Sequence, residues 1–216
     1  AVMGPIVQLD SAVLAGDPLV TDVVVNSPVM WHRDRFGSIP PDEYVRPASI
    51  VFLTYLQDMD PTMGQLRVLP GSHRKSFRIA AGDLWSDQEG ELRIALAAGD
   101  TVALHHNVLH SGGKNTQDVD RMFFGFIYNA SMLRQEDNFD GPNCQAMRDS
   151  ARRCHDRRLL RLLGEDPLIF PRQNSGFTSD EAIDWAAWLS EDETFAAEGR
   201  QHADLAERIR HRPVVP

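Results

Sequence analysis

Short apolar segments separated by Pro, Gly and Asp residues recur through residues 1–131, and this pattern constrains the fold more than any other feature. Short strands at such regular spacing predict a sandwich or jelly roll of β-strands. The segments that we expect to form strands are 20–25, 49–56, 65–69, 92–96, 101–104 and 122–129. The predicted fold class is therefore mainly β.

The chain after residue 140 has a different, helical pattern. Residues 145–163 have apolar side chains at helical spacing and stop at Gly164, a residue suited to a helix C-terminus. A capping sequence at 178–181 precedes another predicted helix, and the charged residues 194–210 form an amphipathic one. We therefore expect two domains: a β core over 1–140, and a helical extension over 141–216 that packs on the core or forms an oligomer interface.

Composition limits the class of protein. A chain of 216 residues can bury one good core. Its net charge of −9 argues against nucleic acid or an anionic membrane as a partner. No apolar run approaches the roughly 18 residues that a membrane span needs, and the first residues do not resemble a signal peptide. Cys144 and Cys154 follow no CxxC spacing and are interpreted as reduced thiols of a cytoplasmic enzyme.

Two His-x-Asp pairs are candidate metal ligands, and predicted secondary structure distinguishes them. Positions i and i+2 point the same way on a strand, whereas on a helix they do not face each other. His202 and Asp204 lie in the predicted helix 194–210, so we interpret them as part of a solvated surface. His32 and Asp34 follow a Val-rich extended stretch, where both side chains can reach one ion.

A third ligand has to come from another strand, and three histidines compete for that role. His105, His106 and His110 lie in one apolar run between a Gly-Asp turn and the Ser-Gly-Gly sequence at 111–113. On one strand, His106 would share a face with His110, and His105 would face the other way. His110 is favoured because it ends the run beside the Gly-rich break, where sites usually open. Among the histidines, only His110 has an arginine eleven residues later.

That arginine, Arg121, begins the next apolar strand, which we expect to form a hairpin with the run 101–110 through residues 114–120. A guanidinium there could bind a carboxylate near the metal in a bidentate manner, which lysine cannot reproduce. The alternative is a surface arginine in a salt bridge. Two imidazoles and one carboxylate on one face of a metal leave positions open for a co-substrate and oxygen, as in non-haem Fe(II) oxygenases.

With these residues and spacings, the chain resembles the phytanoyl-CoA dioxygenase family of Fe(II)/2-oxoglutarate oxygenases. This family includes ectoine hydroxylases and natural-product tailoring enzymes. The most specific parts are the Gly-x-Leu…Pro-Gly-Ser-His block at 64–73 and the spacing of His110, Asn115 and Arg121. The resemblance covers roughly residues 20–131. The matching stretches are WHRD (31–34), FLTYLQDMDPTMGQLRVLPGSHR (52–74), GDTVALHHNVLHSGGKNTQDVDR (99–121) and FFGFIYNAS (123–131).

The resemblance implies a double-stranded β-helix, the cupin-like jelly roll, with helical additions. It implies His32, Asp34 and His110 as the iron ligands and Arg121 as the partner of the distal carboxylate of 2-oxoglutarate. The implied reaction consumes O2, releases succinate and CO2, and hydroxylates an unactivated C–H bond of a small metabolite; some relatives desaturate or cyclise instead. Relatives that halogenate have a small residue in place of Asp34, so a carboxylate there favours hydroxylation.

Two alternatives stay open: a cupin-like metalloenzyme that does not use 2-oxoglutarate, and a non-catalytic jelly-roll binding module. The expected partner is a small-molecule substrate, acidic or zwitterionic, because Arg33, Arg35, Tyr44 and Arg46 lie near the metal ligands in sequence. The protein is expected to be a monomer or a homo-oligomer. Only 31 residues precede His32, fewer than in the family, so we expect that part of the N-terminal region is missing.

Overall fold

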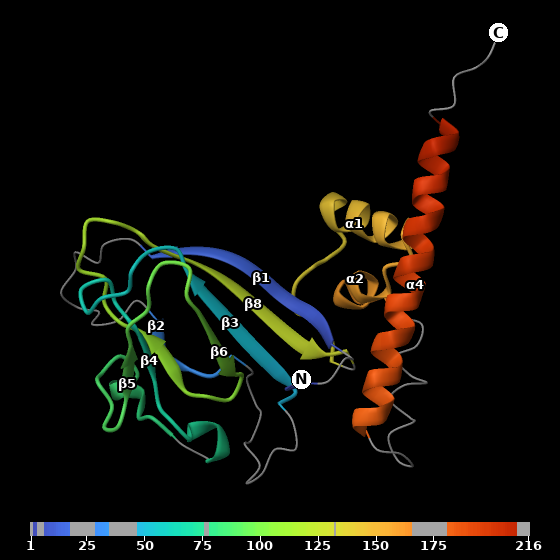
Figure 1. Cartoon of the computed structure of the whole chain (residues 1–216). Coiled ribbons are helices and arrows are strands. Elements are labelled where there is room, and N and C mark those ends of the chain that lie inside the picture. The colour runs from blue at the N-terminus through green and yellow to red at the C-terminus, as the bar shows by residue number, and fades with distance from the viewer. Residues whose placement is uncertain are drawn as a thin grey trace. The chain divides into compact units, whose positions relative to one another are not determined.

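The structure of the protein, a computed structural model, has strands in its first part and helices in its last part (Figure 1). The residues that it describes are 2–3, 7–17, 29–34, 47–75, 78–131, 133–165 and 181–210. The strands are β1 (Val7–Asp17), β2 (Val29–His32), β3 (Ser49–Tyr55), β4 (Leu66–Val68), β5 (Leu92–Ile94), β6 (Thr101–His105), β7 (His110–Gly112) and β8 (Arg121–Ala130). The α-helices are α1 (Pro142–Arg153), α2 (Arg157–Leu162) and α4 (Glu181–Arg210), and the 3-10 helices are η1 (Ser72–Arg74) and η2 (Ala81–Asp83).

The strands form two four-stranded sheets, with the orders β1-β8-β3-β6 and β2-β7-β4-β5. In the first sheet, β3 pairs antiparallel with β6, from Ile50 opposite His105 to Thr54 opposite Thr101. In the second sheet, β7 lies between β2 and β4 and is antiparallel to both. The predicted mainly β fold, a jelly roll with helical additions, is confirmed, and the structure shows it as two antiparallel sheets.

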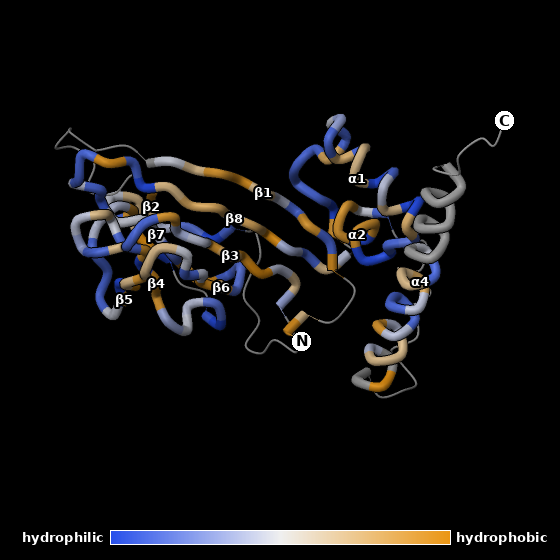
Figure 2. Tube along the Cα trace, turned by 45° about the horizontal axis from the view of Figure 1, so that its top comes forward, coloured by the Kyte–Doolittle hydropathy of each residue, from blue (hydrophilic) through white to orange (hydrophobic). Residues whose placement is uncertain are grey.

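The apolar core joins the two sheets, because alternate residues of each strand point to the same face. Val51 and Tyr55 of β3 pack with Leu66 and Val68 of β4 and with Leu104 of β6. Burying one such large apolar side chain contributes about 1.5–3 kcal/mol. Apolar stretches are visible along β1 and β3 in Figure 2.

The predicted strands at 49–56, 65–69, 92–96, 101–104 and 122–129 correspond to β3, β4, β5, β6 and β8. The predicted strand at 20–25 lies outside the described residues. β1 was not predicted, because its burial pattern is reversed: Gln8 and Asp10 are buried, whereas Val13 and Leu14 are exposed. Asp10 is satisfied locally, since its Oδ1 accepts a hydrogen bond from the backbone N–H of Glu136 at 2.9 Å.

The apolar run 101–110 is not one strand, and this prediction was wrong. β6 ends at His105, the chain turns with a hydrogen bond from Val108 N–H to the His105 carbonyl (2.8 Å), and β7 begins at His110 in the other sheet. The predicted hairpin between this run and the strand after Arg121 is also wrong, because β8 lies between β1 and β3. The chain therefore passes from one sheet to the other between residues 105 and 110.

The helix predicted over 145–163 is divided into α1 and α2, because His155 has a left-handed φ of 54°. α2 ends just before Gly164, whose φ of 83° fits the predicted C-terminal role. α2 packs against α4, where Arg161 and Asp192 form a buried ion pair of 2.9 Å. None of the described helices combines the length and the apolarity that crossing a membrane requires.

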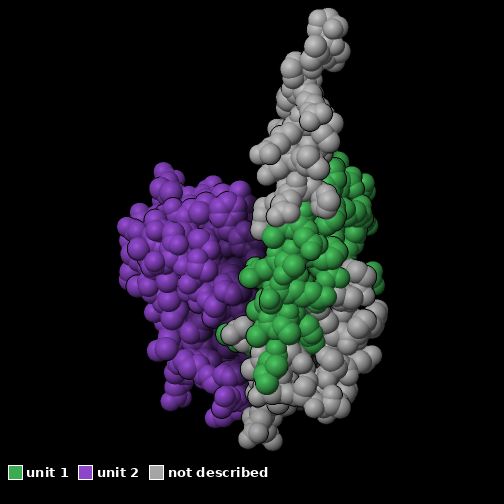
Figure 3. Space-filling model, turned by 45° about the vertical axis from the view of Figure 1, so that its right-hand side comes forward, with its two compact units in different colours: residues 1–10, 129–216 green, residues 11–128 purple. Residues whose placement is uncertain are grey.

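The chain divides into two compact units, one of residues 11–128 and one of residues 1–10 with 129–216 (Figure 3). All residues of the candidate site described below lie in the unit 11–128. The domain boundary predicted after residue 140 stays a prediction.

Candidate metal centre

Strand pairing brings His32, Asp34 and His110 together. His32 is the last residue of β2, Asp34 follows it by two positions, and His110 is the first residue of β7. β2 and β7 are antiparallel, and His32 and His110 are direct partners in their register. The centroids of the two imidazole rings are 4.3 Å apart. The three side chains form a group of possible ligands, although they come from distant parts of the sequence.

The separations within this group suit one metal ion. Asp34 Oδ1 lies 3.8 Å from His32 Nε2 and 3.6 Å from His110 Nε2. These distances leave room for an ion at about 2 Å from each atom, the usual bond length of His and Asp ligands to zinc. Among the described residues, this is the one group of at least three His, Cys, Asp or Glu side chains with ligand atoms within 4.8 Å of one another.

Both imidazoles are oriented by backbone carbonyls. His32 Nδ1 donates to the Met30 carbonyl (2.8 Å), and His110 Nδ1 donates to the Val108 carbonyl (3.1 Å). A neutral imidazole has only one N–H, so each Nε2 keeps a lone pair on the side of Asp34. Burial lowers the pKa of His110, which outweighs the opposing effect of Asp34, and this favours the neutral form that a metal requires.

Asp34 has a buried oxygen that calls for a partner. Its Oδ2 is buried and makes no hydrogen bond to the residues that the structure describes. A buried carboxylate oxygen without a partner is costly, and a divalent cation would offset that cost. Two histidines and one carboxylate are the ligand set of non-haem Fe(II) sites with open positions. The donor set therefore fits iron.

Arg121 lies close to this group, although it begins a strand of the other sheet. The side chain is buried, and its Nη1 donates to the carbonyls of Gly64 and Gly113, the latter at 3.1 Å. A Cβ atom at Gly112 would lie only 2.8 Å from Arg121 Nη2, so glycine is needed there for the guanidinium to keep its place. Sequence reasoning interpreted the glycines at 112–113 only as the end of a strand and missed this role.

The three candidate ligands and Arg121 line one cavity of about 210 Å³. Drug-sized ligands occupy pockets of roughly 300–1,000 Å³, so this cavity suits a more compact molecule. His32 is 28% exposed and forms part of its accessible side. Most of the other lining side chains are apolar: Val13, Val29, Val51, Leu53, Tyr55, Leu66, Phe123 and Ile127.

Of the three competing histidines, only His110 has its imidazole beside the carboxylate of Asp34, whereas His106 contacts Asp34 through its backbone carbonyl, which accepts from the Asp34 N–H at 3.2 Å. His106 is buried, and its Nδ1 donates to the Ser49 carbonyl at 2.9 Å. The ring of His105 stacks on that of His106, with centroids 4.6 Å apart. Burial, reinforced by neighbouring positive groups, lowers the pKa of His105 to about 4. The other His-x-Asp pair, at 202 and 204, lies in α4, and its side chains are outside the described part.

Arg33, which separates His32 from Asp34, does not extend into the cavity lining. Its guanidinium donates to the carbonyls of Asn107, Ser72 (3.0 Å) and Lys75 (3.2 Å). It therefore ties the ligand segment to neighbouring turns. The other residues expected near the substrate, Arg35, Tyr44 and Arg46, lie outside the described residues.

Comparison with known protein families is consistent with this geometry. The model of the family "Phytanoyl-CoA dioxygenase (PhyH)" matches residues 11–123, which is just over half of the chain and includes all four site residues. The chain belongs to this family. PhyH proteins use Fe(II), 2-oxoglutarate and O2, so the resemblance and the cofactors expected from the sequence are confirmed at the level of the family.

Several solved structures are similar to this PhyH chain. One is HygX from Streptomyces hygroscopicus with nickel, 2-oxoglutarate and hygromycin B bound (16% identity, 60% of this chain and 58% of that chain, TM-score 0.49). Another is AviO1 from Streptomyces viridochromogenes Tue57 (22%, 57% and 51%, 0.44). A third is SnoN, a non-haem α-ketoglutarate-dependent epimerase from nogalamycin biosynthesis (21%, 58% and 48%, 0.43). The chain spans about half the length of such structures, and no curated protein sequence matches it.

Proposed function

We propose that this PhyH chain is an Fe(II)/2-oxoglutarate-dependent dioxygenase that hydroxylates an unactivated C–H bond of a small-molecule metabolite. One observation carries the proposal: His32, Asp34, His110 and Arg121 line the same cavity. A metalloenzyme that does not use 2-oxoglutarate would have no need for a buried guanidinium beside its metal ligands. A binding module without catalysis would have no need for the ligand set.

In this proposal His32, Asp34 and His110 hold the iron, and Arg121 binds the distal carboxylate of 2-oxoglutarate. When bound, iron and 2-oxoglutarate supply the oxidising chemistry: O2 and 2-oxoglutarate are converted to succinate and CO2, and one oxygen atom is added to the substrate C–H. The protein orients these groups and excludes water. The bidentate geometry of a guanidinium fixes the direction of a carboxylate as well as its position.

The cavity walls bear on the class of substrate. Leu53, Phe123 and Ile127 contribute apolar surface around the candidate ligands. Apolar walls strengthen the electrostatic interaction of Arg121 with a carboxylate, because the local dielectric constant is low. They also favour a substrate that presents a hydrocarbon portion to the iron. Arg33 gives no support for an acidic substrate, because it does not line the cavity and its guanidinium donates to the carbonyls of Ser72 and Lys75, which do not line it either.

The proposal is tested by Fe(II)-dependent O2 uptake and succinate release in the presence of 2-oxoglutarate. His110→Ala is expected to abolish both, because it removes one of three protein ligands. His106→Ala is the matched control: it removes a nearby buried histidine that does not line the cavity, so metal binding should survive. Metal loss in His106→Ala together with metal retention in His110→Ala would contradict the assignment. Succinate release across amino acids, acyl-CoAs and polyketide or terpenoid acids would then identify the substrate class.

We propose hydroxylation rather than halogenation because Asp34 provides a carboxylate ligand at the position that a halide would need. Asp34→Gly would open one metal position and remove one negative charge. We expect hydroxylation to fall steeply, whereas 2-oxoglutarate should still bind through Arg121 and the two histidines. Product analysis of a single turnover with added chloride is the measurement. A wild-type rate of hydroxylation in Asp34→Gly would show that Asp34 is not a ligand.

A further inference from the structure

The pairing of β2 with β7 contains an irregularity that decides which residue of β2 faces His110. Val29 pairs with Gly112 and His32 pairs with His110, so three steps along β2 correspond to two steps along β7. In a regular antiparallel ladder that starts from Val29 and Gly112, Trp31 would stand opposite His110. The extra residue is a β-bulge, and it brings His32 to the side of the sheet that faces the cavity.

A β-bulge leaves backbone groups outside the regular ladder, and here they find partners on the opposite face of the sheet. Ser111 Oγ donates to the Val29 carbonyl at 2.7 Å. The backbone N–H of Trp31 donates to the Leu84 carbonyl at 2.8 Å, and its indole N–H donates to the Ser86 carbonyl at 2.9 Å. The bulge is therefore held from the face that points away from the metal ligands.

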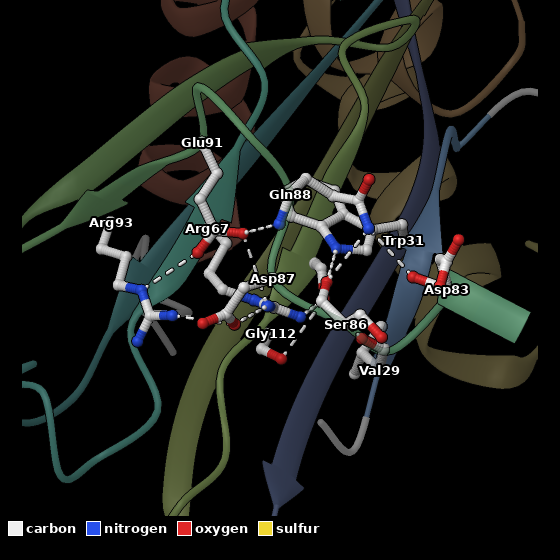
Figure 4. A network of polar contacts seen from close by, with 11 residues as sticks. Val29, Trp31, Arg67, Asp83, Ser86, Asp87, Gln88, Glu91, Arg93 and Gly112 are labelled. Carbon is white, nitrogen blue, oxygen red and sulfur yellow. Dashed lines mark hydrogen bonds and ion pairs between the residues drawn. The ribbon is translucent and has the colours of Figure 1, made fainter. Parts of the chain in front are cut away.

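Arg67 connects these contacts. It is the register partner of Ser111 between β4 and β7, and its Nη2 donates to Ser111 Oγ at 2.7 Å. A hydroxyl has one proton, and the Val29 carbonyl at 2.7 Å is a nearer acceptor for it than the Gly112 carbonyl at 3.4 Å, so Ser111 can accept from Arg67 while it donates to Val29. The same guanidinium lies 4.9 Å from the centre of the Trp31 ring, a cation–π contact (Figure 4). Arg67 thus contacts the bulged strand β2 directly at Trp31 and, through Ser111 of β7, indirectly at Val29.

Two carboxylates hold Arg67 in this position. Asp87 lies 3.1 Å and Glu91 3.5 Å from Arg67 Nη1. Arg93, which is opposite Arg67 in the β4–β5 register, binds the same two carboxylates at 2.9 and 3.0 Å (Figure 4). The two arginines differ in burial, since the side chain of Arg67 is 4% exposed and that of Arg93 is 48% exposed. Of the two arginines, Arg67 is the one whose contacts with Ser111 and Trp31 are seen in the described part of the chain.

We propose that Arg67 is a positioning residue for the metal centre, acting through Ser111 and Trp31 to hold the bulge that places His32 across from His110. The inference rests on the proposed function, because it assigns a purpose to the spacing of the candidate ligands. A role confined to folding would stabilise the sheet without any effect on how the folded protein binds metal.

The experiment uses Co(II) alone as the probe. The whole 216-residue chain is treated with a chelator and is studied well below its unfolding temperature. Affinity is measured by calorimetry, and the ligand geometry is followed by the visible absorption of bound Co(II). Arg67→Met and Ser111→Ala should each weaken Co(II) binding about tenfold, the lower end of the effect of supporting residues on metal affinity, and change the spectrum. Arg93→Met is the matched control and should change neither, because the Arg93 side chain is 48% exposed and no contact of it with Ser111 or Trp31 is seen in the described part of the chain.

Thermal unfolding of each metal-free variant separates the two possible roles. Lower unfolding temperatures with wild-type Co(II) affinity and spectrum in Arg67→Met and Ser111→Ala would overturn the inference. If Arg67→Met does not fold, Ser111→Ala decides alone, because it removes a single hydroxyl. A wild-type chain that binds no Co(II) would refute the proposed function itself, whereas wild-type binding with unaffected variants would refute only the role of Arg67.

Discussion

Replacement of Arg121 tests the proposed binding of 2-oxoglutarate most directly. Its side chain is buried, lies in the cavity of the candidate ligands, and is supported by the carbonyls of Gly64 and Gly113. In the proposed complex, Arg121 and the distal carboxylate of 2-oxoglutarate form a buried charge pair. Truncating one partner of such a pair costs about 2–5 kcal/mol of binding free energy. The dissociation constant of 2-oxoglutarate should therefore rise about thirtyfold to a few thousandfold in Arg121→Ala, since 1.4 kcal/mol corresponds to a factor of ten.

Arg121→Lys should recover only part of this affinity, because an ammonium group cannot bind a carboxylate in a bidentate manner. The assay is calorimetric titration of 2-oxoglutarate into Co(II)-loaded protein, with Arg93→Ala as a control for the loss of an arginine elsewhere. Co(II) affinity should stay near that of the wild type, since Arg121 is not one of the three candidate ligands. Unchanged 2-oxoglutarate affinity in Arg121→Ala would refute the reasoning and require another carboxylate partner.

Three further predictions concern other parts of the chain. Gly112→Ala should weaken 2-oxoglutarate binding but leave Co(II) binding intact, because the new Cβ would lie 2.8 Å from Arg121 Nη2; calorimetry with both ligands checks this. His105, with its pKa lowered by burial from 6.5 to about 4, should destabilise the folded state as the pH falls through that range, since the unfolded chain binds the proton first. Urea unfolding should then show a smaller acid loss of stability in His105→Phe than in the wild type. Asp192→Ala should lower the unfolding free energy by about 3–5 kcal/mol, because it leaves Arg161 as a buried charge without its partner carboxylate. The double variant Arg161→Met with Asp192→Leu should recover most of the lost unfolding free energy, again measured by urea unfolding.

Hydrophobic spacing was sufficient to predict five of the eight described strands, β3, β4, β5, β6 and β8, and its failure at β1 has a physical cause. β1 buries Gln8 and Asp10 and exposes Val13 and Leu14. Strand prediction from apolar residues depends on the buried face being apolar. Here the buried polar side chains form hydrogen bonds with backbone groups that are distant in the sequence. Gln8 donates to the Leu133 carbonyl, and Asp10 accepts from the backbone N–H of Glu136. The sequence around β1 gives no indication of these distant hydrogen-bond partners.

The connection of the strands was harder to predict than their existence. A continuous apolar run from 101 to 110 reads as one strand, yet it supplies the end of β6 and the start of β7 in different sheets. Periodicity reports which residues are buried, and both sheets bury residues in the same core, so it cannot show where the chain crosses between them. His110 lies next to Asp34, and its choice as a ligand rested on its position at the end of the run, whereas the expectation that His106 shares a strand face with it was wrong.

The candidate ligands could be named from the sequence, but their meeting depends on register, which spacing does not encode. A shift of one residue in the pairing of β2 with β7 would put Trp31 where His32 now stands. The residues that oppose such a shift, Arg67 and Ser111, lie on the other face of the sheet and contribute no ligand atom. Introducing the three ligand residues alone into another jelly roll would therefore not be enough to place them correctly. The residues that position these ligands lie on both faces of the sheet.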